Sequence, residues 1–80
     1  MDLIEEKVRK IISENGDLNI DLETVDLETD LTQFGLNSFG FTKILIFIEE
    51  EFKIHIDEYI IKDFDSIVSI KNFIELIKNA

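Results

Sequence analysis

Apolar residues recur at helical spacing in three stretches of the chain, and the first begins near the N-terminus. It covers residues 2–14. Asp2 with Glu5 three positions later is typical of a capping box, and Asn15-Gly16 is a typical helix stop. One stripe collects the apolar residues Leu3, Ile4, Val8, Ile11 and Ile12. The pattern predicts a first helix from Asp2 to Glu14.

The second periodic stretch, residues 38–52, is apolar on more than one side. A helix of this kind is buried on most sides or offers part of its surface to a partner. Its apolar residues are Phe39, Phe41, Ile44, Leu45, Ile46, Phe47, Ile48 and Phe52. The third stretch predicts a helix that is capped by Ser66 and runs to about Lys78. Its apolar positions are Ile67, Ile70, Phe73, Ile74 and Ile77.

The connections between these helices differ in length. Residues 17–35 form a long connection whose scattered apolar residues predict a loop pinned onto the core, with a short turn that starts at Thr29 or Asp30 and closes at Gly35. Residues 53–57 alternate like a strand but are few, so we interpret them as an extended loop. Residues 58–64 hold a short third helix. The chain therefore predicts an all-α four-helix bundle, with three main helices, in a single domain over residues 1–80.

The composition limits the kinds of partner that the protein is expected to bind. A net charge of −10 disfavours nucleic acid and anionic membrane surfaces, and it favours a partner with a basic patch, although acidity also serves solubility alone. The chain has no cysteine, which excludes disulfides and thiolate metal sites. No apolar stretch approaches the roughly 18 residues that a membrane span needs, and the acidic N-terminus is no signal peptide. We expect a cytoplasmic monomer that does not insert into membranes.

Ser38 is the candidate site residue. Its hydroxyl either caps the second helix or serves as an attachment point for another group. Gly35 and Gly40 flank it, and we interpret Gly40 as leaving the nearby backbone open to an approaching enzyme. A helix start also favours a phosphate. His55 is the only histidine, a weak basis for a catalytic pair, so we expect no enzyme activity.

The stretch from Asp30 to Phe39, with an apolar helix that closes in Glu49-Glu50-Glu51-Phe52, resembles an acyl or peptidyl carrier protein. The usual family pattern is Gly-Leu-Asp-Ser-Leu, and the resemblance covers nearly the whole chain. It implies a four-helix bundle of acyl-carrier-protein type and covalent 4′-phosphopantetheine on Ser38. The arm's thiol would bear acyl or aminoacyl groups as thioesters in fatty acid or related biosynthesis. Asn37 stands where the family usually has aspartate, and Lys43 where many members are acidic.

The resemblance also implies partners. These are a phosphopantetheinyl transferase and acyl- or aminoacyl-loading ligases and synthases with basic patches. The residues that the resemblance places toward them are Asn37, Phe39, Phe41, Thr42, Lys43, Ile46, Glu49 and Glu50. Phe41 and Ile46 are equally compatible with ordinary core positions, and the glutamates with a solvated helix end.

Other interpretations stay open. The Ser-Phe-Gly stretch, residues 38–40, also resembles D-alanyl carrier proteins, and a stand-alone aminoacyl, polyketide or nonribosomal-type carrier is an alternative. A different class is an unmodified protein-interaction domain of the same fold. A calcium loop over Asp17–Glu28 lacks the glycine its sharp turn needs, because Leu22 stands there, so we expect no metal site. We interpret His55 as a surface histidine.

Overall fold

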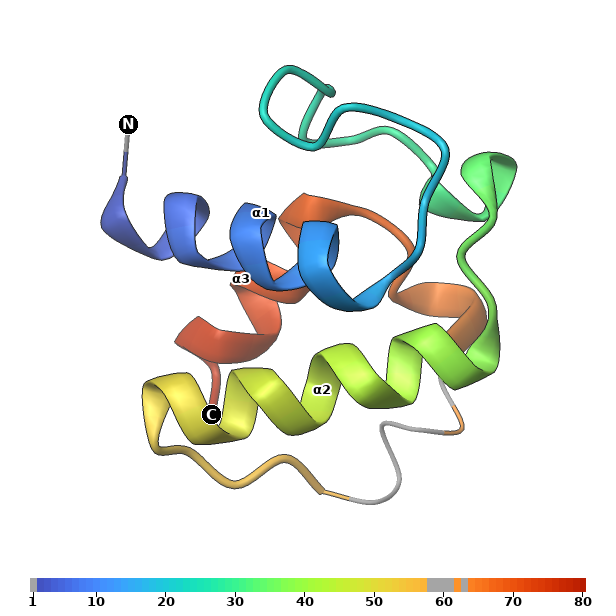
Figure 1. Cartoon of the computed structure of the whole chain (residues 1–80). Helices are drawn as coiled ribbons and strands as arrows, with labels where there is room; N and C mark the ends of the chain where they lie inside the picture. Colours follow the sequence, from blue (N-terminus) through green and yellow to red (C-terminus); the bar gives the residue numbers. More distant parts are fainter. Residues whose placement is uncertain (1, 58–61, 63) are drawn as a thin grey trace.

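The computed structural model describes residues 2–57, 62 and 64–80. They form α1 (Leu3–Asn15), a short 3₁₀ helix η1 (Leu31–Phe34), α2 (Ser38–Phe52) and α3 (Ile70–Lys78), as Figure 1 shows. The described residues contain helices and no strand, which confirms the predicted all-α class. The predicted short third helix falls mostly on residues 58–61 and 63, outside the described part of the chain.

α1 begins and ends for the predicted reasons. Asp2 is its N-cap, with a side chain that accepts a hydrogen bond from the Ile4 N–H at 2.9 Å. At the other end the Gly16 N–H donates to the Ile12 carbonyl at 2.8 Å. The chain then turns away at Asp17, whose φ of 52° lies in the left-handed region. The helix is offset by one residue at each end from the predicted span.

The start of α3 differs from the prediction. Ser69, not Ser66, is the N-cap, and its hydroxyl accepts from the Asn72 N–H at 3.2 Å. Ser66 lies in a short 3₁₀ turn over residues 64–66, and residues 67–69, which the apolar spacing had assigned to the helix, are not helical. The predicted cap at Ser66 is therefore wrong, and Ile67 precedes the helix.

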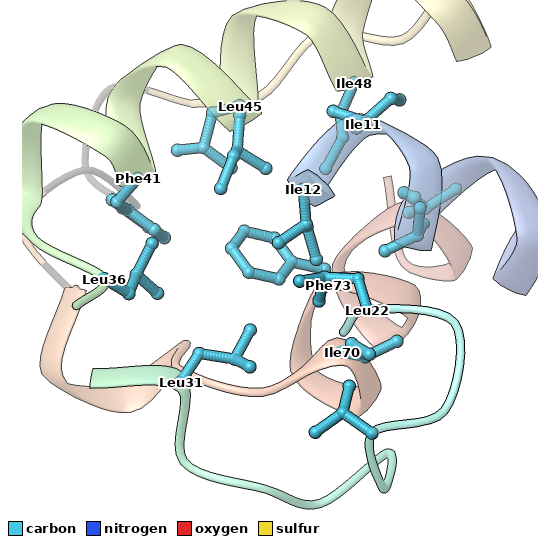
Figure 2. Packing of buried hydrophobic residues seen from close by; sticks show 14 of the residues in the cluster. Ile11, Ile12, Leu22, Leu31, Leu36, Phe41, Leu45, Ile48, Ile70 and Phe73 are labelled. Carbon is cyan, nitrogen blue, oxygen red and sulfur yellow. The ribbon is translucent and has the colours of Figure 1, made fainter. Parts of the chain in front are cut away.

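The core lies where α1 packs against α2 and α3 (Figure 2). Side chains from all three helices are fully buried there: Val8, Ile12, Phe41, Ile44, Ile48, Ile70 and Phe73. The Phe41 ring packs in this core, 5.1 Å from the Phe64 ring and 5.8 Å from the Phe73 ring between centroids. Helices packed in this way leave the N-terminal end of α2 at the surface.

The long first loop is pinned onto this core, as its apolar residues predicted. Leu22, Val25 and Leu31 are buried among the helices. Arg9 of α1 is also buried, and its Nη1 donates to the carbonyls of Leu22 and Val25, both at 2.8 Å. The guanidinium therefore provides a hydrogen-bond donor for two loop carbonyls that would otherwise be buried without one. Of the helices in the described residues, none has the length and apolar content to span a membrane.

Candidate functional site at the start of α2

A short relay of turns delivers Ser38 to the surface. Asp30 caps η1, and Gly35 closes it with a φ of 109° that favours glycine. The Leu36 N–H then donates to the Leu31 carbonyl at 3.1 Å, and the Leu36 side chain is buried. Leu36 therefore anchors the chain directly before α2, and Ser38 follows it at an exposed position.

The cap of α2 is Asn37 and not Ser38. The Asn37 Oδ1 accepts from the Gly40 N–H at 2.9 Å, while its carbonyl accepts from the Phe41 N–H at 2.9 Å. The predicted cap role of Ser38 is therefore wrong. Because Asn37 provides the cap, the Ser38 hydroxyl is not used for it. No hydrogen bond among the described residues uses the Ser38 Oγ, and the Ser38 carbonyl accepts from the Thr42 hydroxyl at 2.8 Å.

Asp30, the N-cap of η1, has a lowered pKa. Hydrogen bonds from the Thr32 side chain, and then from the Thr32 backbone N–H, lower the pKa of Asp30 from its usual value. The ionised carboxylate is therefore the form that caps η1. Because η1 precedes Gly35 and Leu36, this charge supports the turn that presents Ser38.

Gly40 has a packing role. It is buried, and a Cβ built on it would lie 3.4 Å from the Gly16 carbonyl oxygen. The start of α2 therefore lies so close to the end of α1 that a single Cβ would just make ordinary contact, and a larger side chain would not fit without a shift. The interpretation that Gly40 keeps the backbone around Ser38 open is therefore wrong, since Gly40 faces α1 and not solvent.

The predicted partner-facing residues divide into separate groups on α2. Phe39 is 74% exposed and Ile46 is 48% exposed, with Lys43 Nζ 5.8 Å from the Phe39 ring centroid. Glu50 is exposed one turn beyond Ile46. We call Phe39, Lys43, Ile46 and Glu50 the α2 ridge, because their spacing puts them along one face. Phe41 is fully buried, so its predicted place on the partner surface is wrong.

Two further predicted residues lie beside the ridge. Thr42 is half-buried and hydrogen-bonded to the Ser38 carbonyl. Glu49 Oε2 accepts from the Ile56 N–H at 2.8 Å, which ties the chain after α2 to the helix. The sequence interpretation missed Phe47, which is 43% exposed. Phe47 directly follows Ile46 and lies outside the apolar stripe that faces the core, and this position is the sequence signal for its exposure.

No group of three or more His, Asp or Glu side chains among the described residues is arranged to hold a metal ion. In the segment that resembles a calcium loop, Asp21 and Asp26 cap turns instead. The Asp21 carboxylate accepts from the Glu23 N–H at 2.9 Å, and the Asp26 carboxylate accepts from the Glu28 N–H at 2.8 Å. His55 is a surface residue, as expected, with 88% of its side chain exposed.

A protein-family model described as a phosphopantetheine attachment site matches residues 6–74. The chain belongs to the phosphopantetheine-binding carrier protein family. The cofactor of this family is covalently attached 4′-phosphopantetheine. Carrier proteins of this family are not themselves catalytic.

Similar proteins agree with this assignment. The carrier protein is 33% identical over 72 residues to an aminoacyl carrier protein of Agrobacterium fabrum, a match that covers 88% of this chain and 87% of the relative. It is 32% identical over 77 residues to an acyl carrier protein of Nitratidesulfovibrio vulgaris strain DP4, over 95% of both chains. The chain is thus a carrier protein of the acyl or aminoacyl type.

A solved structure shows the same fold. It is the crystal structure of an engineered Bradyrhizobium japonicum glycine:carrier protein ligase, complexed with a carrier protein from Agrobacterium tumefaciens and ATP. The protein described here matches one chain of that structure with a TM-score of 0.81 at 29% identity, over 96% of this chain and 99% of that chain. The predicted fold of acyl-carrier-protein type is confirmed.

Proposed function

We propose that Ser38 is the residue that bears 4′-phosphopantetheine, and that the protein presents acyl or aminoacyl thioesters on this arm to partner enzymes. The observation that carries the proposal is the cap by Asn37, which leaves the exposed Ser38 hydroxyl without a structural role. The N–H groups of Ser38 and Phe39 precede the first backbone hydrogen bond of α2, from Phe41 to Asn37. Such N–H groups and the positive end of the helix dipole suit a phosphate.

The attachment step needs no base on this chain. The Ser38 hydroxyl oxygen attacks the coenzyme A phosphorus that bears pantetheine, and a new O–P bond forms. The bond from that phosphorus to the leaving adenosine 3′,5′-bisphosphate breaks, and the hydroxyl proton passes to the phosphopantetheinyl transferase. The chain contributes the exposed hydroxyl and a helix end that tolerates the phosphodiester charge.

The α2 ridge supplies the surface that we propose partner enzymes touch. Phe39 is adjacent to Ser38 and its ring is mostly exposed, so it offers an apolar anchor next to the arm. Lys43 and Glu50 give the ridge opposite charges near its two ends. Loading ligases and synthases are the expected partners, and fatty acid biosynthesis or a related cytoplasmic pathway is the expected setting. Residues 1–80 act as one carrier domain, and as a monomer, in this proposal.

The similarity to an aminoacyl carrier protein favours aminoacyl cargo as a second candidate within the same function. A D-alanyl carrier would bear such cargo, and a stand-alone polyketide or nonribosomal-type carrier is a further alternative. The alternative of another class is an unmodified interaction domain. It is disfavoured by the match to the phosphopantetheine attachment family, which covers the Ser38 region.

The test is modification of the apo protein by a phosphopantetheinyl transferase and coenzyme A, followed by mass spectrometry. We expect a gain of one phosphopantetheine, absent from Ser38→Ala. The matched control is Ser66→Ala, an exposed serine outside α2, which should still be modified. A gain that persists in Ser38→Ala contradicts the site, and no gain in the unaltered protein supports the unmodified interaction domain.

A further inference from the structure

The C-terminal end of α2 carries a fixed carboxylate beside an exposed imidazole. Lys53 ends the helix in the left-handed region at a φ of 53°, so the chain turns back alongside α2, as Figure 1 shows. The Ile56 N–H donates to Glu49 Oε2 at 2.8 Å and holds that carboxylate in place. His55 Nδ1 lies 3.7 Å from the same oxygen. We call Glu49 and His55 the distal pair.

The distal pair lies on the same face of α2 as Ser38. Glu49 follows Ser38 by eleven residues, which is about three helical turns with a residual rotation of about 20°. The Thr42 hydroxyl, which donates to the Ser38 carbonyl at 2.8 Å, is on this face one turn along. At about 1.5 Å per residue, Glu49 is about 16 Å from Ser38 along the helix axis. Glu50 points about 100° away from Glu49.

The length of a phosphopantetheine arm matches this separation. About thirteen bonds lie between its phosphorus and its sulfur, as many as in about four residues of extended peptide, so the arm spans about 15 Å. An arm attached to Ser38 and extended along this face of α2 therefore brings its sulfur to the level of Glu49. Cargo on that sulfur reaches the distal pair.

The carboxylate has capacity for one more partner. A separation of 3.7 Å from His55 Nδ1 exceeds hydrogen-bond distance, and a carboxylate offers about four lone-pair sites, of which the Ile56 N–H takes one. The α-ammonium group of an aminoacyl thioester is a cation with three donors, which suits this acceptor. An uncharged acyl chain gains nothing from it.

The interior argues for the same cargo class. Phe41 and Phe73 are fully buried, and Phe41 stands 5.1 Å from Phe64 and 5.8 Å from Phe73 between ring centroids. A long acyl chain that entered between α2 and α3 would have to displace these packed rings. A short, charged aminoacyl group remains at the surface and needs no such opening.

We propose that the distal pair is the resting site of the cargo, and that the cargo class it takes is aminoacyl, held through its α-ammonium group by Glu49. The imidazole of His55 flanks the cargo at this site. The proposal rests on the attachment of the arm to Ser38. It assigns to Glu49 a positioning role that is separate from the α2 ridge.

The experiment compares two cargoes on the intact holo protein by ¹H–¹⁵N NMR. Glycyl and acetyl groups are joined to the arm through an amide in place of the thioester, because the amide resists hydrolysis. Mass spectrometry first verifies that every sample bears its arm. We expect the glycyl form to shift the backbone signals of His55 and Ile56, and the acetyl form to leave them at the positions of the unloaded holo protein.

The matched variants are Glu49→Gln and Glu50→Gln. Glutamine at 49 retains an acceptor for the Ile56 N–H but removes the charge, so the glycyl-specific shift should be lost while the fold is retained. Glu50→Gln removes a neighbouring charge on the ridge and should keep the shift. Equal shifts for glycyl and acetyl, persistence of the shift in Glu49→Gln, or no shift on a protein shown to bear the arm would overturn the proposal. Absence of the arm by mass would instead contradict the attachment to Ser38.

Discussion

Gly40 at the start of α2 packs directly against the backbone of Gly16 at the end of α1. A Cβ on Gly40 would lie 3.4 Å from the Gly16 carbonyl oxygen and 3.7 Å from its Cα. The sequence predicts that Gly40 leaves the backbone near Ser38 open. In the structure, Gly40 instead makes a contact between α1 and α2. The contact fixes where the first turn of α2 lies relative to α1, and therefore where Ser38 lies.

Gly40→Ala and Gly40→Val should change stability in opposite directions. Alanine meets the Gly16 carbonyl oxygen at the limit of ordinary contact, and it gains up to about 1 kcal/mol of helix propensity over glycine. We expect a small increase in the free energy of unfolding. Valine adds methyl groups that push α1 from α2, and we expect a loss of about 1–3 kcal/mol. Urea unfolding measures the free energy of unfolding of both variants. An alanine variant that is less stable than the parent would contradict the prediction.

Arg9→Met should loosen the first loop. Both loop carbonyls that accept from Arg9 Nη1 would lose their donor in a buried place, at about 1–3 kcal/mol for each unsatisfied group. We expect a total loss of about 2–6 kcal/mol and faster amide exchange over residues 22–25. The control is Glu5→Gln, which removes only the negative charge opposite Arg9 Nε, 3.1 Å away, and leaves both Nη1 hydrogen bonds in place. Equal losses in the two variants would locate the stabilisation in the ion pair instead.

Asn37→Ala should destabilise α2 by about 1 kcal/mol, because Gly40 loses the side-chain acceptor of its N–H. Asn37→Asp retains a capping oxygen and adds a charge that suits a helix start, so its free energy of unfolding should be at least that of the parent. Ser38→Ala should change stability by far less than Asn37→Ala. Chemical unfolding of the three apo variants distinguishes Asn37 from Ser38 as the cap.

The two adjacent polar residues at this helix start show where sequence interpretation ends. The span of α2 follows from its apolar spacing, and residues 38–52 are helical as predicted. Asparagine and serine have similar preferences for the N-cap, so propensity does not choose between Asn37 and Ser38. The choice depends on the turn that Gly35 and the buried Leu36 impose, and this is a tertiary constraint.

Periodicity also failed at two other places for physical reasons. Ile67 and Ile70 keep a helical spacing, but residues 67–69, which follow the 3₁₀ turn at residues 64–66, are not helical, and α3 begins only after Ser69 caps it. On α2, the apolar residues extend round the helix, so spacing alone does not say which ones are covered. Contact with Phe64 and Phe73 decides that Phe41 is core while Phe39, two residues earlier, is exposed.

Stability should fall in acid partly through Asp30. Its pKa is lowered in the folded state by the Thr32 hydrogen bonds, so the folded protein binds this proton less readily than the unfolded chain. The contribution is therefore present above the ordinary pKa of an aspartate and is lost as pH falls through the lowered folded pKa. Asp30→Asn should flatten the pH dependence of the thermal midpoint between about pH 5 and pH 2.

Phe39→Ala and Phe41→Ala should separate recognition from folding on the same helix. The Phe39 side chain is 74% exposed, so its loss should leave the free energy of unfolding nearly unchanged, yet it removes the apolar anchor beside Ser38. Phe41 is fully buried, and its truncation should cost about 3–5 kcal/mol, a large share of the stability of a small domain.

The measurement for Phe39→Ala is the rate of cargo loading by a cognate ligase, with the protein already in its holo form. We expect a fall of about tenfold or more, the equivalent of about 1.4 kcal/mol of lost interaction. The control is Phe47→Ala, which removes another ring of α2 that is 43% exposed but lies about 80° round the helix from Phe39. A normal loading rate in Phe39→Ala, or an equal fall in Phe47→Ala, would show that partners do not use the ridge as proposed.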